Sequence, residues 1–201
     1  MTVPAARPRG RRPAGEDTRQ LIIDAARGRF AAKGYDATTM RGVARSAEVD
    51  PRLVHHYFES KEDLFVAALD LPVRPQDVVP ALLGPGADGV GERLVRFFFA
   101  VWDSPTGRDQ IVALLGAAIS SPEAARMLRE FLSRELFGRI AQGLGGTDPA
   151  LRGSLVATQM VGLALTRYVL KLEPIASAPI DDLVPWLAPT VQRYLTQDPL
   201  P

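Results

Sequence analysis

Residues 39–61 bring together side chains that can bind a nucleic-acid backbone or contact a base. The candidates are Thr39, Arg41, Asp50, Arg52, Leu53, His55, His56, Tyr57 and Lys61. The guanidinium of Arg52 can donate two hydrogen bonds to guanine O6 and N7, and Leu53 can contact the methyl group of thymine. A threonine hydroxyl or a basic side chain can bind phosphate oxygens. The chemistry that this spacing offers is therefore nucleic-acid binding.

The composition argues against catalysis and metal binding. The chain has no cysteine, and its two histidines are the neighbouring His55 and His56. A nucleophilic triad or a thiolate metal site therefore lacks the partners that it needs. We expect no catalytic residues, no metal and no other cofactor.

Short amphipathic helices must position the candidate side chains. Apolar residues recur at three- and four-residue steps, which predicts helices at about 18–33, 38–47, 51–57 and 60–70. Gly34 is a typical residue just past the end of the first helix. Asp50 is a good N-cap, and Pro51 suits the first position of the third helix. A short turn between the second and third helices is the geometry of a helix-turn-helix motif.

Three sequence runs make this motif specific. They are ATTMRGVA at 37–44, AEV at 47–49 and VHHYFESKEDL at 54–64. The runs closely resemble the DNA-binding domain of TetR-family transcriptional regulators, over about residues 17–70. The resemblance implies a three-helix DNA-binding domain, followed by a helical domain that dimerises and binds a small molecule.

The resemblance also assigns roles to the candidate residues. It places Arg52, Leu53 and His55 on the outer side of the recognition helix, where they can reach base edges. It places the others at backbone contacts or, for Asp50, at the start of the recognition helix: Thr39, Arg41, Asp50, His56, Tyr57 and Lys61.

Three features depart from the family pattern. Glu48 stands where glycine is usual, and a left-handed conformation there would cost about 1–2 kcal/mol, which favours a slightly different path for the turn. The recognition helix begins DPRL at 50–53 in place of the commoner Ser-Lys-Gly-Thr, and position 55 is His in place of a bulky aromatic residue. The base preference of relatives therefore does not transfer to this chain.

Positive charge is concentrated at the N-terminus. Four arginines give residues 1–15 a charge of +4, whereas the whole chain carries +1. A basic end on a nearly neutral chain suggests a local anionic partner. We expect residues 1–16 to form a disordered basic arm, either solvated or inserted into the minor groove of DNA.

The pattern stays helical beyond residue 70. Residues 71–91 contain four prolines and four glycines, which predict a break in regular structure and a domain boundary. Further helices are expected at about 90–103, 106–119, 122–142, 149–172 and 180–196. The prediction is an all-α protein of about nine helices: a basic arm (1–16), a helix-turn-helix DNA-binding domain (17–70), and a helical ligand-binding and dimerisation domain (71–201).

Aromatic and methionine residues predict a large apolar core in the C-terminal domain. In the family that this chain resembles, such helices surround a ligand cavity. The candidate pocket residues are Phe98, Trp102, Met127, Phe131 and Met160. Few charges fall among them, which favours a largely apolar ligand. Ordinary core packing is the alternative for each residue.

Two apolar stripes near the C-terminus resemble the last two helices of the family, which pair with their copies as a four-helix bundle. The candidate dimer residues are Val161, Ala164, Leu165, Tyr168, Leu183, Leu187 and Val191. Packing within one protomer is the alternative. Pro189 predicts a kink or a break in the second stripe.

Together these features predict a cytoplasmic homodimer that represses transcription from a palindromic double-stranded DNA operator and is released by a small-molecule effector. An activator of the same family and a helical ligand-binding module that does not bind DNA are the alternatives. No apolar run is long enough to cross a membrane, and the N-terminus lacks the apolar core of a secretory signal. A G-x-G-x-x-G match at 84–89 is typical of dinucleotide enzymes, but Pro80 interrupts the run before it and no parallel sheet is expected.

Overall fold

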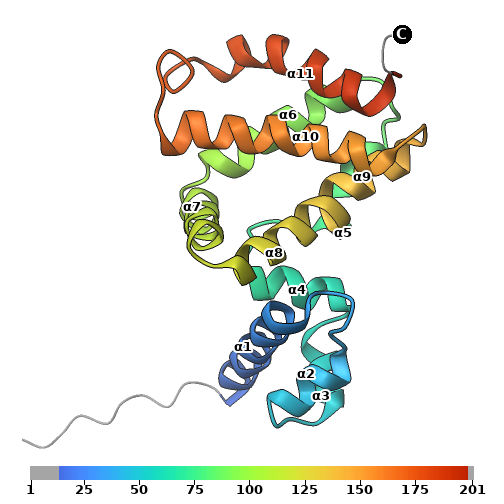
Figure 1. Cartoon of the computed structure of the whole chain (residues 1–201), viewed down its shortest axis with the longest axis vertical. Coiled ribbons are helices and arrows are strands. Elements are labelled where there is room, and N and C mark those ends of the chain that lie inside the picture. The colour runs from blue at the N-terminus through green and yellow to red at the C-terminus, as the bar shows by residue number, and fades with distance from the viewer. Residues whose placement is uncertain (1–13, 199–201) are drawn as a thin grey trace, which may run out of the picture. The chain divides into compact units, whose positions relative to one another are not determined.

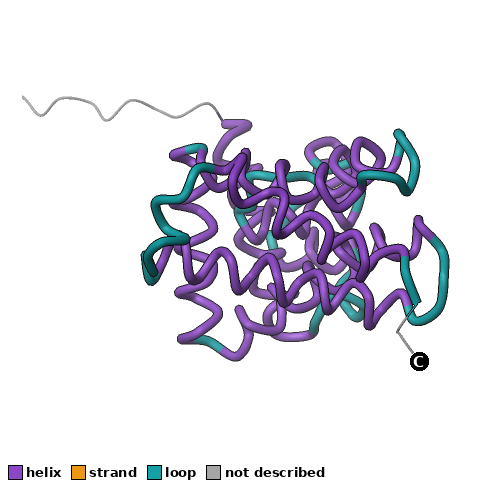
Figure 2. Tube along the Cα trace, turned by 90° about the horizontal axis from the view of Figure 1, so that it is seen from above, coloured by secondary structure: helices purple, strands orange, loops and turns teal. Residues whose placement is uncertain are grey.

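The computed structural model describes residues 14–198, and this part of the chain is helical without a strand (Figure 2). The predicted all-α class is therefore confirmed. The chain divides into two compact units, one up to Ala68 and one from Leu69 onward. Within residues 14–198, no helix is long and apolar enough to cross a membrane.

The first unit is built from four short helices (Figure 1): α1 (Ala14–Lys33), α2 (Met40–Ser46), α3 (Pro51–Tyr57) and α4 (Lys61–Leu69). Its core is aromatic. The Phe30 and Phe65 ring centroids lie 4.7 Å apart in a T-shaped pair, and Tyr35 lies 5.0 Å from Phe65. Val54, on the inner side of α3, and Phe58, just after its end, are both buried. Their burial fixes which face of α3 is turned to solvent.

The first helix begins earlier than predicted. α1 starts at Ala14, so residues 14–16 are helical and do not belong to the expected basic arm. The favourable composition of AGEDTRQ explains the extension, because alanine, glutamate and arginine are good helix formers. The remainder of the arm, residues 1–13, lies outside the described residues.

The second unit consists of seven α-helices and two π-helical segments (Figure 1). They are α5 (Pro75–Leu83), α6 (Val90–Asp103), α7 (Pro105–Ser120), α8 (Pro122–Glu130), the π-helical Phe131–Leu136, α9 (Phe137–Leu144), α10 (Pro149–Ala164), the π-helical Leu165–Val169, and α11 (Ile180–Thr196). α11 packs along α6, and α10 packs along α9.

A close approach between α6 and α11 depends on one glycine. A side chain at Gly91 would place its Cβ 2.6 Å from the backbone nitrogen of Gln192. The Gly91 N–H instead donates to Gln192 Oε1 at 2.8 Å. Glycine at position 91 therefore allows the backbone of α6 to approach α11 closely enough to form this hydrogen bond.

The predicted break at 71–91 was wrong for residues 75–83, which form α5. Pro75 occupies the first turn, where its missing N–H costs nothing, and Val78 and Leu82 bury one face of the helix. Pro80 lies on the exposed side. The α- and π-helical segments join without interruption over 122–144 and over 149–169, so each of these stretches counts as one helix. Counted in this way, the described residues hold ten helices, and α5 is the one that was not predicted.

The C-terminal helix continues through both of its prolines. α11 runs unbroken from Ile180 to Thr196, so the predicted break at Pro189 does not occur. Pro185 and Pro189 both lie on the exposed side, whereas Val184, Ala188 and Val191 are buried. Burial of the opposite face offsets the hydrogen bonds that the two prolines cannot donate.

Candidate DNA-binding surface and ligand cavity

Side-chain caps start the two helices of the predicted helix-turn-helix. Thr39 precedes α2, and its Oγ1 accepts a hydrogen bond from the backbone N–H of Gly42 at 3.1 Å. Asp50 precedes α3, and its Oδ1 accepts from the backbone N–H of Arg52 at 2.7 Å. Both caps satisfy amides that a helix start leaves unpaired. The structure thus gives Thr39 and Asp50 a structural role at the positions where we expected DNA contacts.

The turn between α2 and α3 contains a strained residue. Glu48 has a φ of 55°, in the left-handed region. The turn therefore takes the conformation usual for glycine, and not the different path that the sequence suggested. Contacts on both sides hold it, since the Val49 N–H donates to the Ala44 carbonyl at 3.0 Å.

The outer face of α3 carries four exposed side chains of the predicted set: Arg52, Leu53, His55 and His56. Leu53 is 39% exposed, which leaves its side chain available for an apolar contact. Val54 lies on the opposite face and is fully buried. The structure therefore brings the predicted base-contacting residues together on one side of a seven-residue helix.

Arg41 and Arg45 are exposed on α2. Arg41 was predicted from the resemblance. Arg45 was not, although its spacing of four residues from Arg41 puts it on the same helix face and was a usable signal.

Tyr57 and Lys61 are only partly exposed, and both have partners within the unit. The Tyr57 ring lies 5.0 Å from that of His56. The Lys61 ammonium lies 4.1 Å from the centre of the Tyr35 ring, and it donates to the Asp36 carbonyl at 3.4 Å. Lys61 therefore stands at the N-terminus of α4 in a fixed position, where its charge adds to the positive end of the helix dipole.

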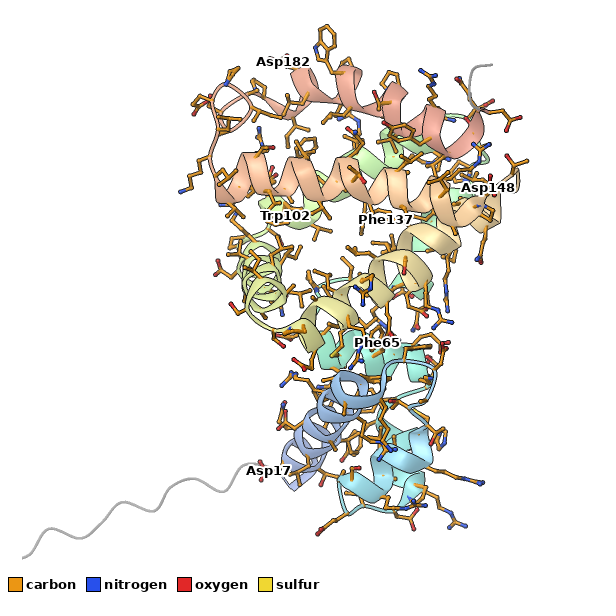
Figure 3. All side chains as sticks on the ribbon, viewed as in Figure 1. Asp17, Phe65, Trp102, Phe137, Asp148 and Asp182 are labelled. Atoms are coloured by element: carbon orange, nitrogen blue, oxygen red, sulfur yellow. The ribbon has the colours of Figure 1, made fainter. Side chains whose placement is uncertain are left out.

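The second unit contains an apolar cavity with about 760 Å³ of empty space, part of it open to solvent. Of the predicted pocket residues, Phe98, Trp102, Phe131 and Met160 line it. Met127 does not line it and is buried in the surrounding core. Figure 3 labels Trp102 of α6 and Phe137 of α9, which both line the cavity.

A π-helical segment supplies part of this lining. Phe131, Leu132 and Leu136 all face the cavity, although they are spaced by one and five residues. In a π-helix, residues five apart lie on the same side, which joins Phe131 and Leu136. Leu128, Leu132 and Leu136 all line the cavity and recur every four residues, so α-helical spacing was a usable signal for Leu132 and Leu136.

Two residues of the link after α4 also line the cavity. Leu71 and Val73 reach it from the segment between α4 and α5. That segment starts at Asp70, which has a left-handed φ of 54° and whose carboxylate accepts from Gln110 Nε2 at 3.3 Å. No sequence signal marks this contact, because the link has neither helical spacing nor aromatic residues.

The structure divides the predicted dimer residues. Val191 is fully buried against α6, and Ala164 is buried and lines the cavity together with Val161. These three residues face the protomer's own interior, so we no longer count them as dimer contacts. Leu165, Leu183 and Leu187 keep part of their surface accessible.

Tyr168 is held within the protomer. Its ring stacks on Trp102 at 4.8 Å, and its hydroxyl donates to Asp103 Oδ1 at 2.9 Å. The Arg108 guanidinium lies 5.4 Å from the ring centre and 3.7 Å from Asp103. Burial, followed by the hydrogen bond to the Asp103 carboxylate, raises the pKa of Tyr168 to about 12. These contacts occupy its hydroxyl within the protomer, but part of the residue stays accessible, so its role at a dimer interface stays a prediction.

A second apolar stripe on α10 was missed. Leu151 and Leu155 are 59% and 37% exposed, and Thr158 and Gly162 continue the same face. The signal was the lack of charge: between 149 and 166 only Arg152 is charged, and it is buried. On α11, Trp186 is 81% exposed. Large exposed apolar side chains on a charge-free helix face are typical of an interface.

The G-x-G-x-x-G match falls in a connection between two helices. Gly84 ends α5, and Gly89 precedes α6 with a left-handed φ of 70°. No strand lies before it in the described part of the chain. The glycines therefore shape a turn and do not form a nucleotide-binding loop.

Comparison with known proteins assigns both units to one family. Residues 22–68 match the model for bacterial regulatory proteins of the tetR family, and residues 88–195 match the model for a tetracyclin repressor-like C-terminal domain. The chain is 30% identical to the transcriptional regulator BetI of Rhizobium meliloti over 166 residues, which cover 81% of this chain and 80% of BetI. It is 23% identical to the regulator UidR of Escherichia coli K12, over 74% of this chain and 78% of UidR. A solved TetR-family regulator of Streptomyces coelicolor shares 42% identity, covers 92% of this chain and 98% of its own, and gives a TM-score of 0.46.

Proposed function

Since this chain belongs to the TetR family of bacterial transcriptional regulators, we propose that it is a dimeric repressor that leaves a palindromic operator when a small apolar molecule fills its cavity. The face of α3 carries this proposal: Arg52, Leu53 and His55 are exposed together, and Val54 anchors the helix from behind. Such a helix can enter the major groove with its polar side against base edges.

Selection of bound fragments from a random DNA pool tests operator binding. We expect a palindrome with half-sites about one helical turn, roughly 34–36 Å, apart. Affinity for that palindrome should fall steeply as salt rises, because phosphate contacts release counterions. Recovery of no enriched sequence, with binding that is equally weak at every salt concentration, would contradict DNA recognition by this chain.

The cavity supports ligand control because the link after α4 forms part of its lining. A ligand that contacts Leu71 and Val73 acts directly on the segment that follows the DNA-binding unit. It can change DNA affinity only as far as it binds one arrangement of that segment better than another.

We expect Val73→Ala to weaken the effect of the ligand on operator affinity more than it weakens ligand binding itself. DNA titrations with and without ligand measure the first quantity, and a titration of the protein with ligand alone measures the second.

The outer faces of α10 and α11 support dimerisation through a second copy of this chain. Leu151 and Leu155 of α10 and Trp186 of α11 expose apolar surface, and the partly exposed Leu183 and Leu187 adjoin it. A two-fold dimer uses the same patch on both copies, which suits a self-complementary apolar face.

Sedimentation of two arginine variants tests this interface. Leu155→Arg buries an unpaired charge at the contact and should shift the protein from dimer to monomer. Ile119→Arg places the same charge on α7, at a residue 82% exposed, and should leave the dimer intact. Equal behaviour of the two variants would place the interface elsewhere.

A further inference from the structure

The charge of the ligand can be inferred from the cavity, an inference that rests on the proposed function of this site. Every side chain that lines the cavity is aliphatic, aromatic or a methionine thioether. No lining residue carries a charge, a hydroxyl or an amide. Among them, the Trp102 indole N–H is the one strong hydrogen-bond donor.

The charged side chains beside Trp102 are engaged with other groups. Asp103 follows Trp102 but accepts from the Tyr168 hydroxyl and pairs with Arg108. Arg108 also donates from Nε to the Trp102 carbonyl at 3.1 Å. Asp103, Arg108 and Tyr168 do not themselves line the cavity.

Glu135 precedes the lining residue Leu136, and Arg167 lies three residues after Ala164, the last lining residue in the sequence; both have partners outside the lining. Arg167 donates to the carbonyls of Ile175 and Ala178 at 2.6 and 2.9 Å. Glu135 forms an ion pair with Arg139 at 2.8 Å. Neither residue is among those that line the cavity.

We propose that the effector is an uncharged, largely aromatic or hydrocarbon molecule with at most one hydrogen-bond acceptor, which pairs with Trp102. A charged group buried here would lose its hydration without gaining a partner. A neutral ring system loses little hydration and gains contacts with the aromatic lining. Trp102 would then set the specificity for one polar atom, and the apolar walls would exclude ions of either sign.

The full-length Trp186→Phe variant provides a direct assay, because Trp102 is then the one remaining tryptophan. We would titrate it with three probes that share a naphthalene core: neutral N-phenyl-1-naphthylamine, anionic 8-anilino-1-naphthalenesulfonate and cationic trimethyl(1-naphthyl)ammonium. The neutral probe should quench Trp102 and bind on the order of 100-fold more tightly than either ion. Charged probes that quench Trp102 within threefold of the neutral affinity would overturn the proposal.

Two variants show that the probe binds inside the cavity. Ala164→Phe fills the lining and should abolish quenching of Trp102 by the neutral probe. If overpacking unfolds that variant, Leu115→Trp serves instead, in a Trp102→Phe background with probe fluorescence as the readout, because Leu115 lines the cavity and is only partly buried. Unchanged affinity in a folded variant would place the probe elsewhere and would contradict the proposal.

Ketone and hydrocarbon analogues test the single polar contact. 2-Acetylnaphthalene should lose about tenfold in affinity when Trp102 is replaced by phenylalanine, whereas 2-ethylnaphthalene should lose much less. Equal losses of affinity for the two compounds would show that Trp102 does not donate a hydrogen bond to the ketone oxygen. Operator binding by the same samples separates this inference from the proposed function: a neutral probe that binds but never releases DNA contradicts the repressor mechanism and leaves the ligand class standing.

Discussion

The two units of this chain place their functional groups in opposite environments. In the first, the side chains that can contact DNA stand on the exposed face of α3, and the residues on its inner face are buried. In the second, the candidate ligand site is an apolar cavity, and charged groups beside it pair with one another.

This difference sets what each unit can recognise. Exposed arginine and histidine side chains keep their hydration until a polar partner replaces it, so the first unit can bind a charged polymer. The lining of the cavity carries no charged group, hydroxyl or amide that could replace the hydration of an ion, and on our proposal it selects molecules that had little hydration to lose. Substitutions should therefore affect the two units through different physical terms.

The largest effect should come from the one buried arginine of the second unit. Arg152 donates to the carbonyls of Thr147 and Gln197, both at 2.6 Å, and to the Asp198 carboxylate at 2.6 Å. It thereby ties the start of α10 to the end of α11. Arg152→Ala should lower the free energy of unfolding by roughly 3 kcal/mol, since it removes several hydrogen bonds from a charged donor together with the packing of a buried side chain. Urea denaturation of the full chain measures this.

Asp198→Ala is the matched control for Arg152. The Asp198 side chain is 77% exposed, so its loss should cost less than about 0.5 kcal/mol. Similar losses in the two variants would mean that the ion pair, and not the hydrogen bonds to the backbone carbonyls, stabilises this end of the unit.

Arg52→Ala should have the next largest effect, on DNA affinity alone. Loss of a bidentate base contact should weaken binding to the selected operator by roughly 10- to 100-fold. Unfolding and probe binding should not change, because Arg52 is exposed on α3. Arg129→Ala removes an equally exposed arginine from α8 and should leave operator affinity unaltered. Full operator affinity in Arg52→Ala would exclude Arg52 from base recognition.

Glu48→Gly should stabilise the first unit modestly. Glycine relieves the left-handed strain at φ 55°, and its greater freedom in the unfolded chain offsets part of this gain. We expect a net increase of about 0.5–1 kcal/mol in the free energy of unfolding. Glu48→Ala removes the same charge but keeps a Cβ, so it should show no gain. A gain from alanine as well would attribute the effect to charge.

Tyr168 should give the smallest effect, at alkaline pH. Its pKa is raised from 10 to about 12 in the folded protein. The stabilisation is therefore fully present below pH 10 and is lost as pH rises toward 12. Thermal unfolding at pH 9 and pH 11.5 should show this loss in the unsubstituted chain and less of it in Tyr168→Phe. Tyr194→Phe, in the same unit, should retain the full loss.

Much of the first unit could be predicted from the sequence, because its signals are local. The Asp50–Pro51 start of α3 and the Thr39 start of α2 are caps that act over three residues. The start of α1 at Ala14 was missed, because no capping residue marks it and the signal is only composition. The left-handed Glu48 was misjudged because the packing of α2 and α3 outweighs its local preference.

The second unit was predicted less completely, because its features depend on contacts between distant segments. Trp102 and Phe131 were expected in the cavity from their size and hydrophobicity, and they line it. Val191 and Ala164 belong to the same helical stripes as accessible residues, and only the packing of α6 and the cavity shows that they face inward.

The sequence by itself determined the family, the helical class and the face of α3 that can meet DNA. These follow from caps, motif residues and periodic apolar positions, which act between residues close in the chain. Only the tertiary structure decided which apolar residues line the cavity, that Leu71 and Val73 are among them, and that the charges beside the cavity pair with one another. The reason is physical: hydrophobic burial is non-directional, so an apolar side chain does not specify which of several interior surfaces it will join.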